Sequence, residues 1–338
     1  MIRVAAFAGD AKEPSARFRI RQYIPYLPRE GVSIVDMHAR LSKYPPEARW
    51  LRPLWGSAKL VELVPKVIQS HRFDTVLLQR EMVSTFLTLE ALTKKPRILD
   101  VDDAIFLYRG GGFARRLAQM SDRVVCGNPY LAEWFGLWNR NVTIIPTAVD
   151  AARYFPLSDN NDVADRKAIG WLGTSGNLKY LYSIENALAK TLRMVPEAQL
   201  VVVCDKAPEF QCIDPGRIKY VHWEEKSEVE SIQSMDVGIM PLDDTPWSRG
   251  KCSFKMLQYM ACGLPVVVSP VGMNAEVLAM GNLGVAAHTE SKWADALIAL
   301  LERKDMRSQM GSTGRKIIEE RFSIDVIAPR LAACLRGK

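Results

Sequence analysis

Residues 255–276 read KMLQYMACGLPVVVSPVGMNAE, and their pattern decides the fold class. The first part favours a helix over Met256–Ala261, which Gly263 then ends. Val266–Val268 is a run of β-branched residues and predicts a short buried strand, followed by a loop that contains Gly272. A helix that leads through a tight turn into an apolar strand is typical of a parallel α/β sheet.

The same alternation runs along the whole chain of 338 residues. Strands are expected at 2–7, 32–37, 75–79, 97–100, 123–126, 142–145, 167–172, 199–203, 218–222, 237–240, 266–268 and 283–286. Helices are expected at 15–27, 57–71, 82–92, 180–194 and 324–335. At about 150 residues per domain, this length and pattern predict two Rossmann-like α/β domains with parallel sheets facing a central cleft. We expect them at 1–155 and 165–322, joined by a linker rich in Asp and Asn at 156–165.

The composition is that of an ordinary globular protein, with 48% apolar and 25% charged residues. No apolar run reaches the roughly 18 residues of a membrane-spanning helix, and charge follows Met1–Phe7 too soon for a signal peptide. The six cysteines form no C-x-x-C pair and no zinc-like spacing with histidine. We therefore expect a cytoplasmic protein with reduced thiols and without a bound metal.

The net charge of +7 is unevenly distributed. Residues 1–155 carry 23 basic and 15 acidic side chains, whereas residues 156–338 carry 22 and 23. A basic half favours an anionic partner, either a phosphorylated substrate or the anionic inner face of the cytoplasmic membrane, unless it is simply a solvated surface. The absence of a zinc finger, an RNA-binding aromatic signature or a block of Lys and Arg argues against nucleic acid.

One segment combines aromatic and basic residues in a way that suits peripheral membrane docking. Its members are Arg40, Lys43, Tyr44, Arg49, Trp50, Arg52, Trp55 and Lys59. The alternative is that both tryptophan rings belong to the core and that the charges solvate a loop.

Ligands of parallel sheets bind at the carboxyl ends of the strands, so the residues just after strands are the site candidates. In the first half these are Asp102 and Asp103, together with Arg80 after the preceding strand. Asp100 and Asp102 form a D-x-D, a pattern that can hold a divalent metal, but the α/β alternation argues against a metal here, and a capped turn is the alternative. Arg17 and Arg19 are candidates for gripping a phosphate, or for a solvated helix face.

In the second half, the loop Gly173–Asn177 follows a strand and offers backbone N–H groups to a phosphate, or is an ordinary tight turn. Arg249, Lys251 and Lys255 gather where a helix is expected to begin. Because the helix dipole disfavours cations there, they indicate a bound anion such as a diphosphate, or else a solvated run of charges.

Residues 255–276 resemble the nucleotide-sugar-binding region of glycosyltransferase family 4, which has the GT-B fold. The similarity lies in M-A-x-G-x-P-V-V followed by S-P-V-G-x-N-x-E. Residues 170–174 are similar to the strand and loop that open the carboxyl-terminal domain of this family. Residues 15–27 and 142–150 resemble the first helix and the V-I-P-N-G-V-D element of its bacterial polysaccharide-cluster members.

The resemblance implies a transferase that moves a sugar from a nucleoside-diphosphate sugar to a glycan or a lipid-linked acceptor. It further implies a retaining reaction without metal or other cofactor, and a final helix at 323–338 that crosses back to the first domain. Two glutamates that many members carry would fall at Gly250 and Gln258, and Thr174 stands where an arginine is usual. These departures leave a non-catalytic nucleotide-sugar-binding or partner protein as the alternative.

The resemblance also assigns residues. The expected donor-binding residues are Gly173, Thr174, Ser175, Lys179, Arg249, Lys251, Lys255, Gln258, Val271, Gly272, Met273, Asn274 and Glu276. The expected catalytic residues are Asp102, Asp103 and Lys255, and the acceptor-binding residues are Arg17, Arg19 and Arg80.

Overall fold

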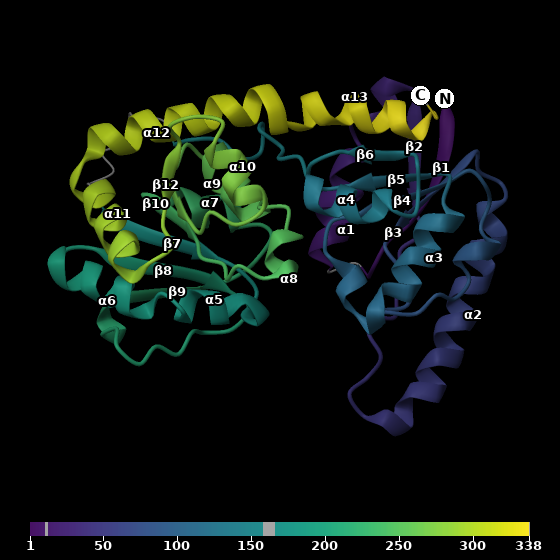
Figure 1. Cartoon of the computed structure of the whole chain (residues 1–338), viewed down its shortest axis with the longest axis horizontal. Coiled ribbons are helices and arrows are strands. Elements are labelled where there is room, and N and C mark those ends of the chain that lie inside the picture. The colour runs from purple at the N-terminus through teal and green to yellow at the C-terminus, as the bar shows by residue number, and fades with distance from the viewer. Residues whose placement is uncertain (11–12, 158–165, 338) are drawn as a thin grey trace. The chain divides into compact units, whose positions relative to one another are not determined.

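A computed structural model describes residues 1–10, 13–157 and 166–337. The chain divides into two compact units (Figure 1). The first unit consists of Met1–Ala148, Arg249–Cys252 and Ile324–Lys338, and the second of Val149–Ser248 and Ser253–Ser323. The division thus falls after Ala148 rather than at 155, and residues 158–165 of the expected linker lie outside the described residues.

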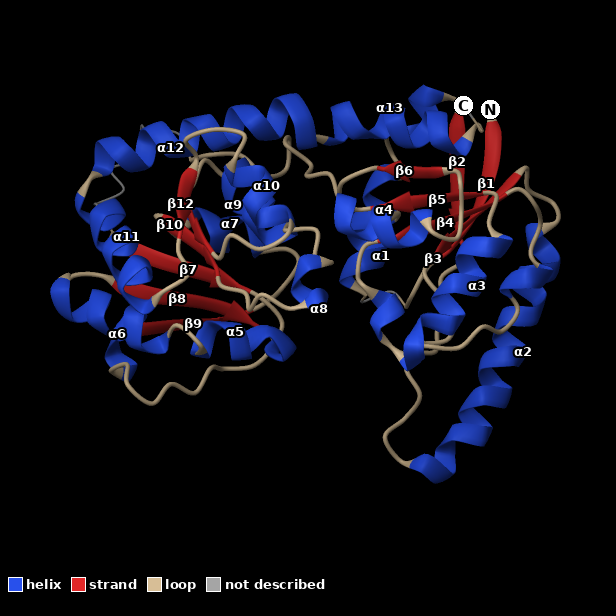
Figure 2. Cartoon of the chain, viewed as in Figure 1, coloured by secondary structure: helices blue, strands red, loops and turns tan. Residues whose placement is uncertain are grey.

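The first unit is built on a parallel six-stranded sheet in the order β2-β1-β3-β4-β5-β6 (Figure 2). Its strands are β1 (Ile2–Phe7), β2 (Val32–Asp36), β3 (Thr75–Gln79), β4 (Arg97–Val101), β5 (Arg123–Cys126) and β6 (Val142–Ile144). Its helices are α1 (Pro14–Arg19), α2 (Arg52–Ser70), α3 (Gly112–Met120), α4 (Pro129–Gly136) and α13 (Ile324–Leu335). The strand order reverses between β1 and β3, which makes their carboxyl ends the natural crevice of this sheet.

The second unit repeats this architecture with the order β12-β11-β10-β7-β8-β9. Its strands are β7 (Ala168–Leu172), β8 (Gln199–Cys204), β9 (Ile218–His222), β10 (Val237–Met240), β11 (Val266–Val268) and β12 (Gly284–Ala286). Its helices are α5 (Leu178–Tyr182), α6 (Glu185–Met194), α7 (Glu228–Gln233), α8 (Pro246–Arg249), α9 (Phe254–Ala261), α10 (Met273–Leu278), α11 (Glu290–Glu302) and α12 (Lys304–Ile317). Here the order reverses between β7 and β10.

Each unit has its own apolar core, as the alternation of strands and helices requires. In the first unit, α13 places Ile324, Ile327 and Leu331 on a core formed with β1 and the residues that follow α1. In the second, Trp171 and Leu200 of the sheet pack among apolar side chains of α6 and α11. The expected α/β class with parallel sheets is confirmed, and every expected strand is present within one residue at either end.

The expected helix at 82–92 is wrong. This stretch is an irregular loop that ends in a single 3₁₀ turn, and the buried Glu90 carboxylate organises it. Glu90 accepts hydrogen bonds from the backbone N–H groups of Met82 (2.8 Å) and Thr88 (2.5 Å). A carboxylate that satisfies two backbone donors competes with the helical hydrogen bonds of the same residues.

Two other expected helices are interrupted. The segment 15–27 is helical only to Arg19, because Ile20 leaves the helical region with φ −126° and short 3₁₀ turns follow. The segment 180–194 divides into α5 and α6 at Ile184, which has φ −113°. Apolar spacing continues through both breaks, so periodicity alone does not reveal them.

Candidate functional sites

In the first unit, Arg80 is the centre of a charged cluster at the carboxyl ends of β3 and β4. Its guanidinium lies 3.1 Å from a carboxylate oxygen of Asp102, 3.1 Å from one of Asp103 and 3.3 Å from one of Glu13. The side chain is 7% exposed, and the backbone has φ +59°, a left-handed conformation that costs roughly 1–2 kcal/mol. Sequence reasoning assigned Arg80 to the acceptor, but the structure makes it the group that holds three carboxylates.

The pKa values of the two adjacent aspartates are shifted in opposite directions. Burial raises the pKa of Asp103 to about 6, and the neighbouring Asp102 charge adds to this effect. Burial would also raise the pKa of Asp102, but the Arg80 and Arg19 guanidiniums outweigh it and hold that pKa below its usual range. Two carboxylates with divergent pKa values are characteristic of catalytic sites. Asp103 is the more accessible of the two, with 24% of its side chain exposed against 11% for Asp102.

The short segment Arg249–Cys252 belongs to the first unit and lies against this cluster. Asn128 donates from Nδ2 to the carbonyl oxygens of Gly250 (3.0 Å) and Lys251 (3.1 Å). The positive charge of Lys251 lowers the pKa of Asp103, although burial and Asp102 keep it raised. A Cβ at position 250 would lie 2.6 Å from the Cβ of Ala104, which explains why a glutamate is absent there.

The sequence suggested that Arg19 binds the acceptor, but in the structure its side chain is buried and not open to a ligand. It forms a two-pronged ion pair with Asp100, at 2.5 Å and 3.0 Å, and both side chains are 3% exposed. It also donates to the carbonyl oxygen of Ile145 at 2.8 Å. The pair therefore ties α1 to the middle of the sheet, and it engages both oxygens of the first aspartate of the D-x-D.

Arg17 remains partly exposed, with its guanidinium 4.6 Å from the centre of the Phe18 ring. Arg17 and Arg21 do not share a helix face, because α1 ends at Arg19. Arg21 instead pairs with Asp36 at 2.7 Å.

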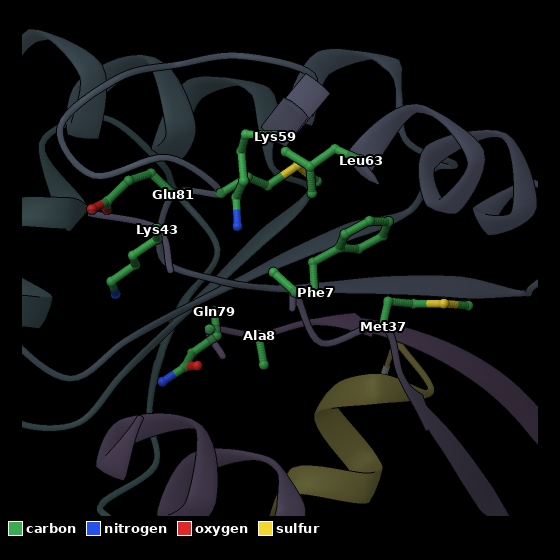
Figure 3. A pocket seen from close by; sticks show the side chains of 11 residues that line it. Phe7, Ala8, Met37, Lys43, Lys59, Leu63, Gln79 and Glu81 are labelled. Atoms are coloured by element: carbon green, nitrogen blue, oxygen red, sulfur yellow. The ribbon is translucent and has the colours of Figure 1, made fainter. Parts of the chain in front are cut away.

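A small pocket lies at the reversal point of the first sheet, beside β1 and β3 (Figure 3). It is lined by apolar side chains such as Phe7, Met37 and Leu63, and by the buried Lys59, whose ammonium donates to the carbonyl oxygen of Leu41 at 2.6 Å. Its volume of about 10 Å³ accommodates about one water molecule, so we place no substrate inside it.

In the second unit, the loop after β7 is held by a residue that sequence reasoning missed. Asp205, directly after β8, accepts from the backbone N–H of Ser175 at 2.6 Å and from its hydroxyl at 2.8 Å. A Cβ at Gly173 would lie 2.2 Å from the Trp171 ring, so glycine is required at the strand end. Thr174 and Lys179 are exposed on this loop and the helix that follows it. An acidic residue that follows a buried strand is the signal that would have found Asp205.

The segment 269–276 follows β11 as a loop up to Gly272 and continues into the first turn of α10. Gly272 has φ +52°, so the chain needs glycine to make this turn. Met273 and Asn274 are buried, and Asn274 donates to the carbonyl oxygen of Ser269 at 3.0 Å. The parts of this expected donor loop that stay accessible are therefore Val271, Gly272 and the exposed Glu276.

Gln258 was expected to bind the donor, but its side chain is 2% exposed and belongs to an internal network. Its amide nitrogen donates to the Tyr154 hydroxyl at 3.0 Å and to a Glu228 carboxylate oxygen at 3.1 Å. The second Glu228 oxygen accepts from the Trp223 indole at 2.7 Å. Glutamine suits this place because a glutamate would bury a second negative charge against Glu228.

The three cations expected at one helix start are separated along the chain. Arg249 ends α8, whereas α9 begins at Phe254, after Ser253 with φ +51°. Lys255 alone lies in the first turn of α9. Arg249 and Lys251 belong to the first unit.

The carboxyl-terminal part of the chain, residues 166–303, matches the family described as "Glycosyl transferases group 1". This part of the chain is similar to group 1 glycosyl transferases. It contains all six strands of the second sheet, the β7 loop and the loop 269–276.

Curated relatives agree with this assignment. The chain is 23% identical to a GDP-mannose-dependent monoacylated alpha-(1-6)-phosphatidylinositol monomannoside mannosyltransferase of Corynebacterium glutamicum, over 57% of this chain and 56% of the relative. It is 27% identical to a D-inositol 3-phosphate glycosyltransferase of Corynebacterium jeikeium, over 50% and 46%. The chain thus spans about half the length of the curated relatives that it matches.

Solved structures are similar to the chain beyond the matched residues 166–303. The chain is similar over its full length, with a TM-score of 0.73 and 14% identity, to all of Anabaena Alr3699/HepE, a structure in complex with UDP and glucose. It is also similar to WaaG, a glycosyltransferase involved in lipopolysaccharide biosynthesis, with a TM-score of 0.67, 12% identity and coverage of 99% and 100%. The chain therefore has the GT-B fold.

Proposed function

We propose that this protein is a glycosyltransferase that moves a sugar from a nucleoside-diphosphate sugar to a glycan or a lipid-linked acceptor. The observation that carries the proposal is the group 1 match over the second sheet, which includes the loop after β7 and the loop 269–276. The relatives support both substrates by name: one uses GDP-mannose and acts on a phosphatidylinositol mannoside, and a similar structure contains UDP and glucose.

The first unit supplies the group that faces the acceptor. Asp103 has a pKa of about 6 and is mostly ionised at neutral pH, so it can accept the proton of an acceptor hydroxyl. That hydroxyl oxygen forms the new bond to the anomeric carbon on the same face from which the diphosphate departs, as retention of configuration requires, while the bond from this carbon to the diphosphate breaks. Arg80 holds the carboxylate in place, and cations and backbone N–H groups stabilise the leaving diphosphate.

We further propose that the reaction retains the anomeric configuration and needs no metal. The ion pairs of the D-x-D support metal independence: Asp100 is already paired with Arg19, and Asp102 is paired with Arg80. The absence of carboxylates at Gly250 and Gln258 favours the alternative of a binder that does not catalyse.

One assay separates these proposals. Radiolabelled UDP-, GDP- and dTDP-sugars are incubated with the protein in EDTA, and slow release of free sugar is expected from one of them. Binding without release supports the non-catalytic alternative, and activity that returns only with Mn²⁺ contradicts metal independence. The anomeric configuration of the product, read by NMR, tests retention.

Lys255 is expected to contribute most directly to diphosphate binding, because it stands in the first turn of α9 beside the matched motif. A charge-assisted contact contributes about 1.5–3 kcal/mol, so Lys255→Ala should weaken nucleoside-diphosphate binding about 10-fold or more. Calorimetry measures this change. Lys316→Ala removes an exposed lysine of α12 and is the matched control, expected to leave the affinity unchanged. Equal affinities of both variants and the unmodified protein would remove Lys255 from the site.

A further inference from the structure

Helix α2 buries Leu63 and Val67 and also carries apolar residues on its exposed face. Val61 is 74% exposed and Ile68 is 67% exposed, whereas Lys59 on the same helix is 1% exposed. Leu54, at 70%, continues the line of Val61 and Ile68 at a spacing of seven residues, and Leu60 and Val64 flank it at 43% each. Apolar residues at this spacing form one stripe, about 21 Å long from position 54 to 68.

Apart from Arg52 at its first position, the charged side chains of α2 bond to groups of the protein itself. Lys59 donates to the carbonyl oxygen of Leu41, and Lys66 donates to that of His38 at 2.7 Å. Glu62, the single acidic residue of the helix, accepts from the backbone N–H of Leu41 at 3.2 Å and from Lys66 at 2.8 Å. The outer stripe is therefore left without charge, which is uncommon on a surface that faces only water.

Basic residues bracket the stripe. Arg49 and Arg52 are exposed at its amino end, next to Trp50, which is 79% exposed. At the carboxyl end of α2, Arg72 is exposed, and the ring of His71 lies 3.0 Å from the carbonyl oxygen of Leu92 in the neighbouring loop. Figure 1 shows α2 running along the edge of the first unit.

We infer that the outer stripe of α2 is a docking surface for an anionic lipid bilayer. The apolar stripe suits the acyl boundary, Trp50 suits the interfacial zone, and the arginines suit anionic headgroups. Two copies of the chain pairing through this face would bring their arginines together, so charge favours the bilayer over a second copy.

This surface differs from the segment expected from the sequence. Lys43 and Lys59 are buried rather than available to headgroups, and Trp55 is half-buried. The exposed apolar residues of α2, which sequence reasoning left out, take their place. Among the described residues, no helix is both long and apolar enough to cross a membrane. Docking would therefore occur in the plane of the interface.

Vesicle co-sedimentation tests the inference and does not depend on catalysis. The full-length protein is expected to pellet with vesicles of phosphatidylcholine and phosphatidylglycerol, to be released by raised salt, and to stay soluble with phosphatidylcholine alone. Each basic residue near an anionic surface raises affinity about five-fold, so Arg49→Glu with Arg52→Glu should reduce binding by well over 10-fold.

The apolar stripe is tested by Val61→Glu with Ile68→Glu, which should also reduce vesicle binding at least 10-fold. Both side chains are exposed, so the thermal unfolding temperature should not fall. Met194→Glu, a change of a 62% exposed residue on α6, is the matched control and should bind like the unmodified protein. Equal pelleting of the stripe variant and the control, or pelleting with both vesicle types or with neither, overturns the inference. So does a dimer in analytical ultracentrifugation that the stripe variant abolishes while vesicle binding is absent.

Discussion

Asp103→Asn is expected to make the protein more stable at pH 8 while it removes most of the transferase activity. The folded state holds this carboxyl at a pKa of about 6, against 3.8 for an unperturbed aspartate, chiefly because it is buried. Keeping it ionised at pH 8 therefore costs folding free energy, roughly 2–3 kcal/mol. Asparagine removes that cost together with the proton acceptor, and a general base contributes about 100-fold or more to the rate.

The sign of the pH dependence follows from the raised pKa. A group with a raised folded pKa contributes stability that is fully present below its unfolded pKa and is lost as the pH rises through its folded pKa. The unmodified protein should thus lose stability relative to Asp103→Asn between about pH 4 and pH 6, and the difference should stay constant above that window. Urea unfolding at a series of pH values measures it.

Asp102→Asn is the matched control, because this residue is the direct neighbour of Asp103 and its substitution is expected to change the stability at pH 8 in the opposite direction. The Arg80 and Arg19 guanidiniums hold the pKa of Asp102 below its usual range against the effect of burial. Its stability contribution is present above the unfolded pKa and is lost as the pH falls. At pH 8 this variant should be less stable than the unmodified protein. A shift of both variants in the same direction would show that the two carboxyls do not differ as described.

The sequence predicts the inner strands of both sheets because these strands are largely buried on both faces and are mostly apolar. All five residues of β3 and of β4 are buried. The helix expected at 82–92 fails for the opposite reason, since its apolar spacing says nothing of the Glu90 carboxylate that folds the loop back on itself.

The candidate site is predictable to the extent that it depends on strand ends. The position of Asp102 and Asp103 at a strand end was predictable because they directly follow β4, whose carboxyl end is fixed by the fold class. Arg19 and Gln258 were misassigned because their partners are remote in the chain: Asp100 is 81 residues from Arg19, and Tyr154 is 104 residues from Gln258. Only the packing of the folded chain decides whether such a side chain bonds to partners inside the protein or stays accessible to a ligand.

The Arg19–Asp100 pair provides the second large expected effect. Asp100→Ala should lower the free energy of unfolding by about 3–5 kcal/mol, because it leaves the guanidinium of Arg19 buried without a carboxylate. The double variant Arg19→Met with Asp100→Leu should recover most of this loss, since it removes both charges and fills the space with apolar atoms. Urea unfolding of the three proteins measures the pattern, and a loss below about 1 kcal/mol in Asp100→Ala would contradict it.

The double variant also separates a structural role of Arg19 from an acceptor-binding role. If Arg19 gripped a phosphate of the acceptor, a folded protein without it would need far more acceptor to reach the same rate. The guanidinium instead has both carboxylate oxygens and a backbone carbonyl as partners, and it is 4% exposed, so little of it is left for a ligand. We therefore expect the folded double variant to keep its KM for the acceptor. A KM raised 10-fold or more at unchanged stability would return Arg19 to the binding site.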